Sequence, residues 1–367
     1  MALERDNRKA SEIDCAQEIT GKLDALARGG CLHLPCGQYN IASPIVLDRS
    51  STGLDGGIWS CNTDPNGVFE SRHGTKIRMH GRDYPAICVG REHSPISGAV
   101  IREIGVQGDI VGMDTRKLVD FDAPEKAAGL CIDSVRTDQC AFVRLSFCGL
   151  ANAVCVTGDA EVDACRFERI NTDGCGNGFY FAPRASYYAQ IHSCVAADNP
   201  YYGVYARGGK MHNLLISDTH FVRNGGAFGE KDGHLPAAVL FDHVFRSEVA
   251  RCLFDAPGTF WYYNDDAKEN GERQPTYRKT VALHVIGNEN RIRDNTFLHS
   301  SDDAIRVEGD GNVLLSNIVD GDVRICGTGN QVINLAFTRP EARLILCGAA
   351  KDSTYVTGVA EERIVRI

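Results

Sequence analysis

The sequence lacks several features that would assign a function class at once. No run of about 18 apolar residues occurs, so no membrane-spanning helix is expected. The N-terminal "MALERDNRKASEIDC" has no apolar centre of the kind a signal peptide needs, which predicts a cytoplasmic protein. Basic residues are outnumbered, with 39 Lys and Arg against 48 Asp and Glu, and the net charge of -9 disfavours a nucleic-acid backbone as partner. Sugars remain compatible with this charge.

Motifs of several enzyme classes are missing as well. There is no G-x-S-x-G, and "GEKDGH" and "ARGGK" lack the glycine-lysine-hydroxyl spacing of a P-loop. The 15 cysteines include no C-x-x-C pair, and no Cys/His spacing indicates a zinc site. Several cysteines stand in apolar runs, so we interpret them as small buried hydrophobic residues in a reducing compartment: "LCI" at Cys131, "VCV" at Cys155, "RIC" at Cys326 and "LILC" at Cys347.

What the sequence does contain is a repeat. From Gly129 onward a short apolar strand, a polar turn, a second short strand and a loop recur about every 25 residues or fewer, except where two loops are inserted. The opening strands read "GLCI", "AVCV", "GFYF", "GVYA", "AVLF", "ALHV", "AIRV", "VRIC" and "LILC". Such strands cannot each bury a face alone, whereas stacked rungs bury a column of apolar side chains. With no helix in the period, the pattern predicts one all-β domain, a parallel β-helix over residues 1–367.

The second strand of some repeats opens with asparagine. "NLLISD", "NRIRDN" and "NVLLSN" begin at Asn213, Asn290 and Asn312. Asn295 lies five residues after Asn290, and Asn317 lies five residues after Asn312. Asp218 is at the equivalent position after Asn213. Stacked asparagines can bond to their equivalents in neighbouring rungs, so we expect ladders that satisfy the turn backbone.

The start of the chain fits the same architecture. "SEIDCAQEITGKLDALARGG" predicts an amphipathic helix within residues 11–28, begun by Ser11 and ended by glycines. Its apolar positions lie on one face and would cover the open end of the solenoid: Ile13, Ala16, Ile19, Leu23 and Leu26. Together with the following "GCLHLPCGQYNIASPIVL", this stretch resembles the N-terminus of pectin-lyase-like proteins. The resemblance implies a single-stranded right-handed parallel β-helix with a capping helix and a carbohydrate ligand along one sheet face.

The candidate site lies at the turns that precede the opening strands. Stacking brings these turns into one column, and the two inserted loops, 224–236 and 259–279, end in it. Cleaving a glycosidic bond needs a proton donor and a second carboxylate, so the catalytic candidates are Asp302, Asp303, Asp198, Asp232 and Lys279. Candidates for sugar binding by stacking or hydrogen bonding are Trp261, Tyr262, Tyr201, Tyr202, Tyr277, Arg278, His234, Asp173, Asp265 and Asp266. For the doublet Asp302-Asp303 a plain turn role remains the alternative.

Two enzyme families share single motifs with the chain. "SDDAIRV" and the "NTDG" at Asn171 are similar to polygalacturonase motifs. Here Asp173 and Asp302 lie several rungs apart, and the family's "GHG" and "RIK" elements are absent, which argues against that activity. The order of rungs resembles inulin fructotransferases, which are trimers with active sites between subunits. Where that family has an aspartate in "PDGV" this chain has "YYGV" with Tyr202, so another acid such as Asp198 or Asp232 would be needed.

These observations predict an enzyme that cleaves or transfers a glycosidic bond of an oligo- or polysaccharide, a glycoside hydrolase or a fructotransferase-like protein. One alternative is a polysaccharide lyase or epimerase, in which Lys279, Arg278, Tyr202 or His234 removes a proton and calcium assists. The other is a non-catalytic β-helix that binds glycans or has a structural role. No cofactor is expected for the first interpretation, and the resemblance implies a homo-oligomer, a trimer by analogy.

Overall fold

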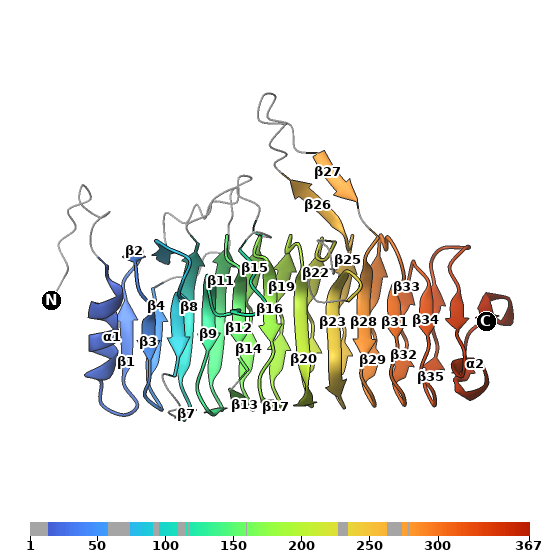
Figure 1. Ribbon diagram of the computed structural model, residues 1–367, viewed down its shortest axis with the longest axis horizontal. Helices are drawn as coiled ribbons and strands as arrows, with labels where there is room; N and C mark the ends of the chain where they lie inside the picture. The colour runs from blue at the N-terminus through green and yellow to red at the C-terminus, as the bar shows by residue number, and fades with distance from the viewer. Residues whose placement is uncertain are drawn as a thin grey trace.

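The computed structural model describes residues 14–57, 74–90, 95–108, 115, 118–158, 160–226, 234–262, 274–277 and 279–367. The chain coils into a long right-handed parallel β-helix (Figure 1), as predicted. Helix α1 (Ala16–Asp24) lies at one end, and α2 (Ala350–Ser353) and a short 3-10 helix (Glu361–Arg363) lie at the other. No helix in the described ranges is long and apolar enough to cross a membrane.

The strands stack in four columns, numbered here in the order in which the chain passes through a rung. The first column contains β3 (Ile45–Leu47), β6 (Ile87–Val89), β9 (Ala128–Ile132), β12 (Asn152–Val156), β16 (Asn177–Phe181), β20 (Tyr202–His212), β23 (Ala237–Phe245), β28 (Val281–Ile286), β31 (Ile305–Val307), β34 (Val323–Ile325), β37 (Leu344–Leu346) and β39 (Ile364–Arg366). The second, short column contains β7 (Ile96–Ser97), β10 (Thr137–Asp138), β13 (Glu161–Asp163) and β17 (Ala185–Tyr187), and continues into the ends of β20 and β23.

The third and fourth columns belong to one large parallel sheet. The third contains β1 (Cys31–Leu34), β4 (Gly53–Gly56), β8 (Val100–Gln107), β11 (Ala141–Cys148), β14 (Arg166–Glu168), β18 (Gln190–His192), β21 (Leu215–Ser217), β24 (Glu248–Ala250), β29 (Arg291–Arg293), β32 (Val313–Leu315), β35 (Gln331–Ile333) and β38 (Tyr355–Thr357). The fourth contains β2 (Gly37–Ile41), β5 (Thr75–Met79), the ends of β8 and β11, β15 (Asn171–Asp173), β19 (Val195–Ala197), β22 (His220–Val222), β25 (Leu253–Asp255), β30 (Thr296–Leu298), β33 (Ile318–Val319) and β36 (Ala336–Phe337). An antiparallel hairpin of β26 (Thr259–Tyr262) and β27 (Gln274–Tyr277) projects from this body.

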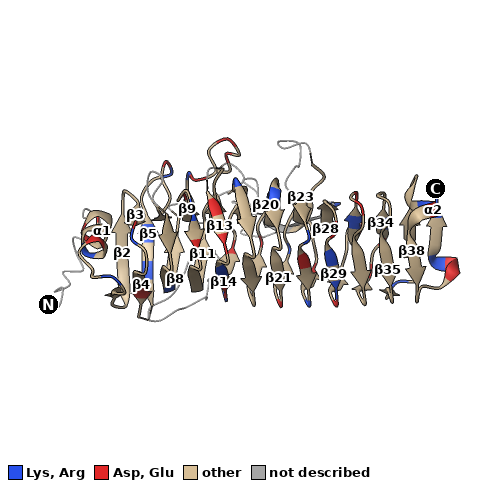
Figure 2. Ribbon diagram, turned by 90° about the horizontal axis from the view of Figure 1, so that it is seen from below, with Lys and Arg blue, Asp and Glu red and all other residues tan. Residues whose placement is uncertain are grey.

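The interior is a single apolar column in which equivalent side chains stack from rung to rung. Phe221, Phe254 and Phe297 are register partners on three successive strands of the fourth column. Their ring centroids are 4.9 and 4.5 Å apart, which is the strand spacing of a parallel sheet. Charged residues of both signs are distributed along the outside of the body (Figure 2). The alternating strand pattern therefore gives the predicted apolar interior, and the outside carries charges of both signs.

Helix α1 closes the N-terminal end of this column. It buries Ala16, Ile19 and Leu23 against the core. Asp14 stands in for a capping residue, because its carboxylate accepts hydrogen bonds from the Ala16 N–H at 3.0 Å and from the Ser43 hydroxyl at 2.6 Å. The helix is shorter than the predicted 11–28 range, and the predicted cap Ser11 lies outside the described residues.

Side-chain ladders satisfy the turn backbone, as the asparagine pattern predicts. In the turn before the third column, Asn312 Oδ1 accepts the Asn290 N–H at 2.9 Å, and Asn330 Oδ1 accepts the Asn312 N–H at 2.8 Å. In the next turn Asn317 Oδ1 accepts the Asn295 N–H at 3.1 Å. All five side chains are almost fully buried. Each ladder therefore replaces, rung by rung, the hydrogen bonds that a tight turn leaves unmade.

The predicted ladder register is wrong by one residue at Asn213 and Asp218. Both have a positive φ, 58° and 53°, and occupy the left-handed position that precedes the ladder. The ladder position beside Asp218 belongs to Thr219, whose Oγ1 accepts the Cys194 N–H at 3.3 Å. A polar residue of either type fits the left-handed position, so the sequence pattern alone did not distinguish the two sites.

Cysteines take ladder positions in the earlier rungs, which explains part of their abundance. Cys194 Sγ accepts the Ile170 N–H at 3.4 Å, and Cys140 Sγ accepts the Ala99 N–H at 3.3 Å. Cys131 and Cys155 are buried, as predicted. The same prediction is wrong for Cys326 and Cys347, which are only half-buried because they follow the last residues of β34 and β37.

Candidate functional site

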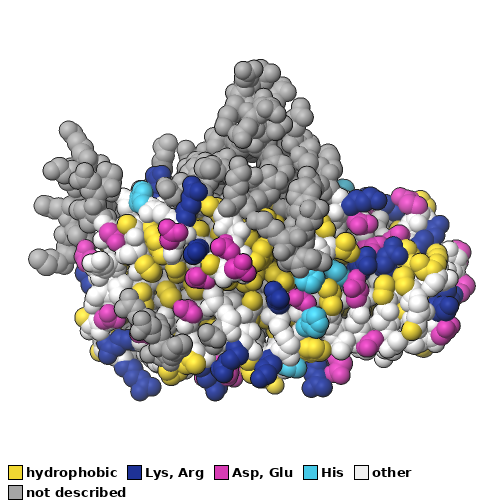
Figure 3. Space-filling model, in the orientation of Figure 1, with side chains coloured by type: hydrophobic (Ala, Val, Ile, Leu, Met, Phe, Trp, Pro, Cys, Tyr) yellow, Lys and Arg dark blue, Asp and Glu magenta, His cyan; other side chains and the backbone are white. Residues whose placement is uncertain are grey.

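A cavity of about 240 Å³ opens where the turns after the fourth column meet the first column near the C-terminal end. Three successive rungs contribute to it, and five of its residues are carboxylates. The lining residues are Ser300, Ser301, Asp302, Asp303, Asp320, Gly321, Asp322, Arg324, Arg339, Glu341 and Ala342. Acidic and basic side chains lie side by side toward the C-terminal end of the face seen in Figure 3. The predicted doublet Asp302-Asp303 thus lies in a concave, strongly polar site.

Asp303 is the buried member of the doublet. Its side chain lies on the outer surface of the first column, and only 4% of the residue is exposed. Arg324, on the next rung, donates from Nε to Oδ2 at 2.9 Å and from Nη2 to Oδ1 at 3.4 Å. Burial raises the pKa of Asp303, the two bonds from Arg324 oppose that rise, and the net direction is upward. Asp303 is therefore a carboxyl group held in one orientation that keeps its proton to a higher pH than usual.

Asp302 is exposed and lies at the same cavity. Adjacent residues of an extended chain point to opposite sides, and the doublet follows this rule in burial. Both residues line the cavity, and the backbone departs from regular pairing just after them: the Ala304 N–H donates to the Asp322 carbonyl at 2.7 Å, whereas the strand pairing begins at Ile305. The site thus combines one solvated and one desolvated carboxyl group on consecutive residues.

The floor of the cavity continues a ladder. Asp320 Oδ1 accepts the Ser300 N–H at 3.1 Å, as Asn199 Oδ1 accepts the Cys175 N–H at 3.1 Å earlier in the same column of turns. Arg339 Nη2 lies 3.1 Å from Asp320 Oδ2. Within the described residues the buried hydroxyl of Ser300 has no hydrogen-bond partner. Asp320 therefore has a structural role in the ladder, and the Ser300 hydroxyl is buried beside it.

A chain of charged groups leads from the cavity along the outer surface of the first column. Arg306 Nη1 lies 4.0 Å from Asp303 Oδ2, and its Nε donates to Glu308 at 2.7 Å. Glu308 Oε1 in turn lies 3.2 Å from Nε2 of the buried His284. The bond to His284, followed by the contacts with Arg306, lowers the pKa of Glu308 to about 2. Glu308 is therefore ionised near neutral pH, whereas the pKa of Asp303 is shifted upward by burial.

An aromatic cluster occupies the same outer surface nearer the N-terminus. Tyr202 stacks on Tyr205 with centroids 4.9 Å apart, and Phe121 meets Tyr201 edge-on at 5.6 Å. Both Tyr201 and Tyr202, predicted to bind sugar, are more than nine-tenths buried in this cluster. His234, a further predicted ligand, lies beside it with Nε2 3.3 Å from a carboxylate oxygen of Asp242. These three residues lie on the predicted face but belong to a packed cluster outside the cavity.

The remaining predicted residues that the structure describes do not line the cavity. Asp198 sits in a left-handed turn, where Arg223 Nη2 lies 2.6 Å from its Oδ2. Asp173 is half-buried at the end of β15. Lys279 is exposed and precedes Thr280, whose N–H donates to the cavity residue Ser301 at 3.1 Å. Asp232, Asp265, Asp266 and Arg278 lie outside the described residues, as do the side chains of Trp261, Tyr262 and Tyr277.

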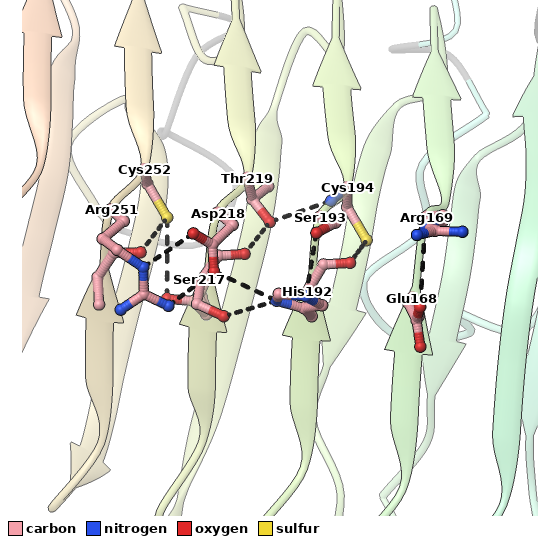
Figure 4. Close-up of polar contacts among 12 residues, drawn as sticks. Glu168, Arg169, His192, Ser193, Cys194, Ser217, Asp218, Thr219, Arg251 and Cys252 are labelled. Atoms are coloured by element: carbon pink, nitrogen blue, oxygen red, sulfur yellow. Dashed lines mark hydrogen bonds and ion pairs between the residues drawn. The ribbon is translucent and has the colours of Figure 1, made fainter.

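A second row of polar contacts follows the turn between the third and fourth columns (Figure 4). His192 Nδ1 lies 3.0 Å from Ser217 Oγ, and its Nε2 lies 3.1 Å from Ser193 Oγ. Asp218 is held by Arg251 through two bonds of 2.8 and 2.7 Å. The side chains of His192, Asp218 and Arg251 are 34 to 47% exposed, so we interpret the row as a surface ladder between rungs rather than as a site.

Among the described residues, no group of three or more His, Cys, Asp or Glu side chains is arranged to hold a metal ion. The predicted set also lacks two arginines, Arg324 in the cavity lining and Arg306 beside Asp303. Arg306 and Arg324 stand at the same place in the successive openings "AIRV" and "VRIC", and the two strands pair in that register. Comparing the openings position by position, rather than only the turns before them, would have found both residues.

No family model matches the chain, and no curated protein matches it by sequence. Solved structures do share its fold. The DFA-IIIase from Arthrobacter chlorophenolicus A6 in complex with GF2 is 17% identical, with a TM-score of 0.64 over 98% of this chain and 94% of that chain. A mutant of this DFA-IIIase in complex with DFA-III is 18% identical, with a TM-score of 0.61 over 95% and 84%. The form without its lid, with GF2, is 16% identical, with a TM-score of 0.62 over 94% and 93%. At this identity the likeness shows a common parallel β-helix fold.

Proposed function

We propose that the protein is a carbohydrate-active enzyme that cleaves or transfers a glycosidic bond, with Asp302 and Asp303 as its carboxyl pair. The observation that carries the proposal is the cavity in which one exposed and one buried carboxyl group stand next to each other. Glycosidic cleavage needs one group that donates a proton to the leaving oxygen and another that acts on the anomeric carbon or on water. Two carboxyl groups in different environments can divide these roles.

Asp303 suits the acid. Burial raises the pKa of its carboxyl group, so the protonated form persists to a higher pH, and Arg324 fixes the group in one orientation. Asp302 then acts as the nucleophile or base from the exposed side of the cavity. Nothing in this scheme requires a redox cofactor or a metal ion.

The matched structures support a saccharide as substrate. Three forms of the same DFA-IIIase align with nearly the whole chain, and they hold GF2 or DFA-III, which are sugars. A fructotransferase-like reaction on a fructan is therefore the form of the proposal that we place first. The departure at "YYGV" stands, because Tyr202 is buried in the aromatic cluster and supplies no carboxylate. In this chain the acids would come from a different rung, that of Asp302 and Asp303.

The charge of the cavity disfavours a polyuronate lyase at this position. A uronate carboxylate needs a cation to bind it, but both cavity arginines are already paired, Arg324 with Asp303 and Arg339 with Asp320. Asp302, Asp322 and Glu341 add further carboxylates to the lining, which would repel an anionic sugar. The nearest candidate base, Lys279, does not line the cavity. The lyase alternative therefore has less support than glycosidic cleavage.

The test is product analysis with matched variants. The protein is incubated with inulin-type and levan-type fructans, pectate and alginate, and products are followed as reducing ends, as anhydrides by chromatography, and as ultraviolet absorbance of a new double bond. We expect fructan products that Asp302→Asn and Asp303→Asn each reduce by at least about a hundredfold, while Asp198→Asn retains activity. Circular dichroism verifies that all three variants fold. Unsaturated products, or full activity in both doublet variants, would contradict the proposal.

A further inference from the structure

Two half-buried cysteines stand next to the cavity. Cys326 follows β34 and Cys347 follows β37, and these strands pair so that Ile325 faces Leu346, the residues just before the two cysteines. The Cys347 N–H donates to the Ile325 carbonyl at 2.8 Å, so the regular pairing continues to the cysteines themselves. Neighbouring strands of a sheet are about 4.8 Å apart, which lies within the range of about 4.4–6.8 Å between the Cα atoms of disulfide-bonded cysteines.

Cys347 also contacts the cavity. Arg324, which holds Asp303 with Nε and Nη2, directs its third nitrogen, Nη1, to Cys347 Sγ at 3.9 Å. One guanidinium group therefore bridges the buried carboxyl group of the candidate site and a thiol that solvent can reach. A group attached to Cys347 Sγ would occupy the place of this contact and compete with the bonds by which Arg324 orients Asp303.

We propose that Cys326 and Cys347 form a thiol–disulfide modification site that reacts with low-molecular-weight disulfides such as oxidised glutathione and thereby controls the position of Arg324. The inference is independent of the proposed function, because it concerns two sulfur atoms and one arginine whatever reaction the cavity performs.

The exchange proceeds in two steps that balance without another oxidant. Burial, together with the neighbouring sulfur of Cys347, raises the pKa of Cys326 to about 11, so we assign the first attack to Cys347. Its thiolate displaces one glutathione thiolate from oxidised glutathione and forms a mixed disulfide. Cys326 then loses its proton to solvent, attacks the protein sulfur of that mixed disulfide and releases the second glutathione as thiolate. The protein dithiol is oxidised by two electrons, and one glutathione disulfide is reduced to two thiols.

The chain contains matched pairs that lack the proposed reactivity. Cys131 and Cys155 are register partners on β9 and β12, and Cys140 and Cys165 precede the paired residues of β11 and β14. These four thiols are all buried. They have the backbone spacing of the Cys326–Cys347 pair without its access to solvent, so they separate the effect of spacing from that of exposure.

The experiment treats the full chain with oxidised glutathione, alkylates the remaining thiols and identifies disulfides by peptide mass spectrometry. We expect a Cys326–Cys347 cross-link that dithiothreitol reverses, with no cross-link in the two buried pairs. Cys326→Ser should leave a glutathione adduct on Cys347, and Cys347→Ser should leave no adduct on Cys326. Equal modification of the buried pairs, or an adduct on exposed Cys31 with none at Cys326 or Cys347, would overturn the proposal.

The link to Arg324 has its own readout. In an NMR spectrum, the ¹⁵Nε–Hε resonance of Arg324 reports the bond from Nε to Asp303. The resonance is assigned as the one that disappears in the Arg324→Lys variant. We expect this resonance to shift on oxidation and to return with dithiothreitol in the wild type, and to stay unchanged in the Cys326→Ser, Cys347→Ser double variant. A cross-link that forms without any shift would refute control of Arg324.

Discussion

Two carboxyl groups that flank strand β31 should respond to acid in opposite senses. Glu308 is bonded to His284 and Arg306, and its pKa is lowered to about 2 from an ordinary value of 4.5. Asp303 is buried, and its pKa is raised from 3.8 despite the bonds from Arg324. The two groups lie on the same rung; burial is the largest cause of the Asp303 shift and the contact with His284 that of the Glu308 shift, so each is a control for the other.

The magnitude for Glu308 follows from linkage. A carboxyl group with a depressed folded pKa stabilises the protein above its unfolded pKa and loses that contribution as pH falls through the folded pKa. A gap of roughly two to three pKa units sets a ceiling of about 3 kcal/mol at 1.36 kcal/mol per unit. One third of the side chain is exposed, so solvent screening reduces the expected contribution to about 1–2 kcal/mol. We expect Glu308→Gln to lose this amount at pH 7 and to approach the wild type as the pH falls from about 4.5 to about 2.

The sign is reversed for Asp303. A raised folded pKa means that the fold prefers the protonated carboxyl group, so its contribution is fully present below the unfolded value of 3.8 and is lost as pH rises through the folded pKa. As the pH falls from neutral to 3.8, the stability of the wild type should therefore rise relative to that of Asp303→Asn. Over an overlapping but lower pH range, the stability of the wild type should fall relative to that of Glu308→Gln. Because Asn carries no charge at any pH, the difference between wild type and variant isolates the titration of Asp303.

The assay is urea unfolding followed by circular dichroism at a series of pH values, with the three proteins compared at each one. Mutant differences are used because the cooperativity of a long repeat array varies with conditions. If the stability differences for Asp303→Asn and Glu308→Gln change with pH in the same direction, the burial argument for Asp303 is wrong. The contrast between the buried Asp303 and the exposed Asp302, on which the proposed division of roles depends, would then be wrong as well.

Two further predictions concern the solenoid. Asn312→Ala removes the acceptor of the buried Asn290 N–H, which should cost about 2–4 kcal/mol in urea unfolding, whereas the exposed Gln331→Ala should change stability by less than about 0.5 kcal/mol; equal effects would show that the ladder is not stabilising. Gly309→Ala places a Cβ 1.9 Å from the Gly287 carbonyl oxygen and should cost about 1–3 kcal/mol, so an unchanged melting temperature would contradict the close stacking of these turns.

The fold was predictable because each rung repeats the same physical requirement. Each repeat contains apolar residues at alternating positions, a turn residue and a small ladder side chain. These features recur often enough for the opening strands of the repeats alone to predict the stacking. The errors in the ladder register, at Asn213 and Asp218, arise because asparagine and aspartate suit both the left-handed position and the ladder position. Only the next residue, such as Thr219, shows which of the two it is.

The site was predictable only in part, for a reason that lies in the solenoid itself. The sequence places a turn residue on a rung, but the neighbouring rungs decide whether its side chain meets a partner. Asp198 and Asp303 both precede or flank an opening strand and both end against an arginine one rung later, Arg223 and Arg324. The side chain of Asp303 is 5% exposed and lies at the cavity, whereas that of Asp198 is 26% exposed and does not line this cavity. That difference is invisible in a single sequence.

The chain bends just before β31, where the doublet Asp302-Asp303 lines the cavity. If this segment continued the strand regularly, Asp302 and Asp303 would point to opposite sides, and one of them would be lost to the site. The Ala304 N–H instead reaches the Asp322 carbonyl, outside the regular ladder, and both residues of the doublet line one cavity. A turn that only linked two strands would not need this irregularity, since the asparagine ladders close the neighbouring turns without it. The bend is therefore the feature of the doublet that a purely structural role leaves unexplained, and it is the reason we assign the chemistry to this rung.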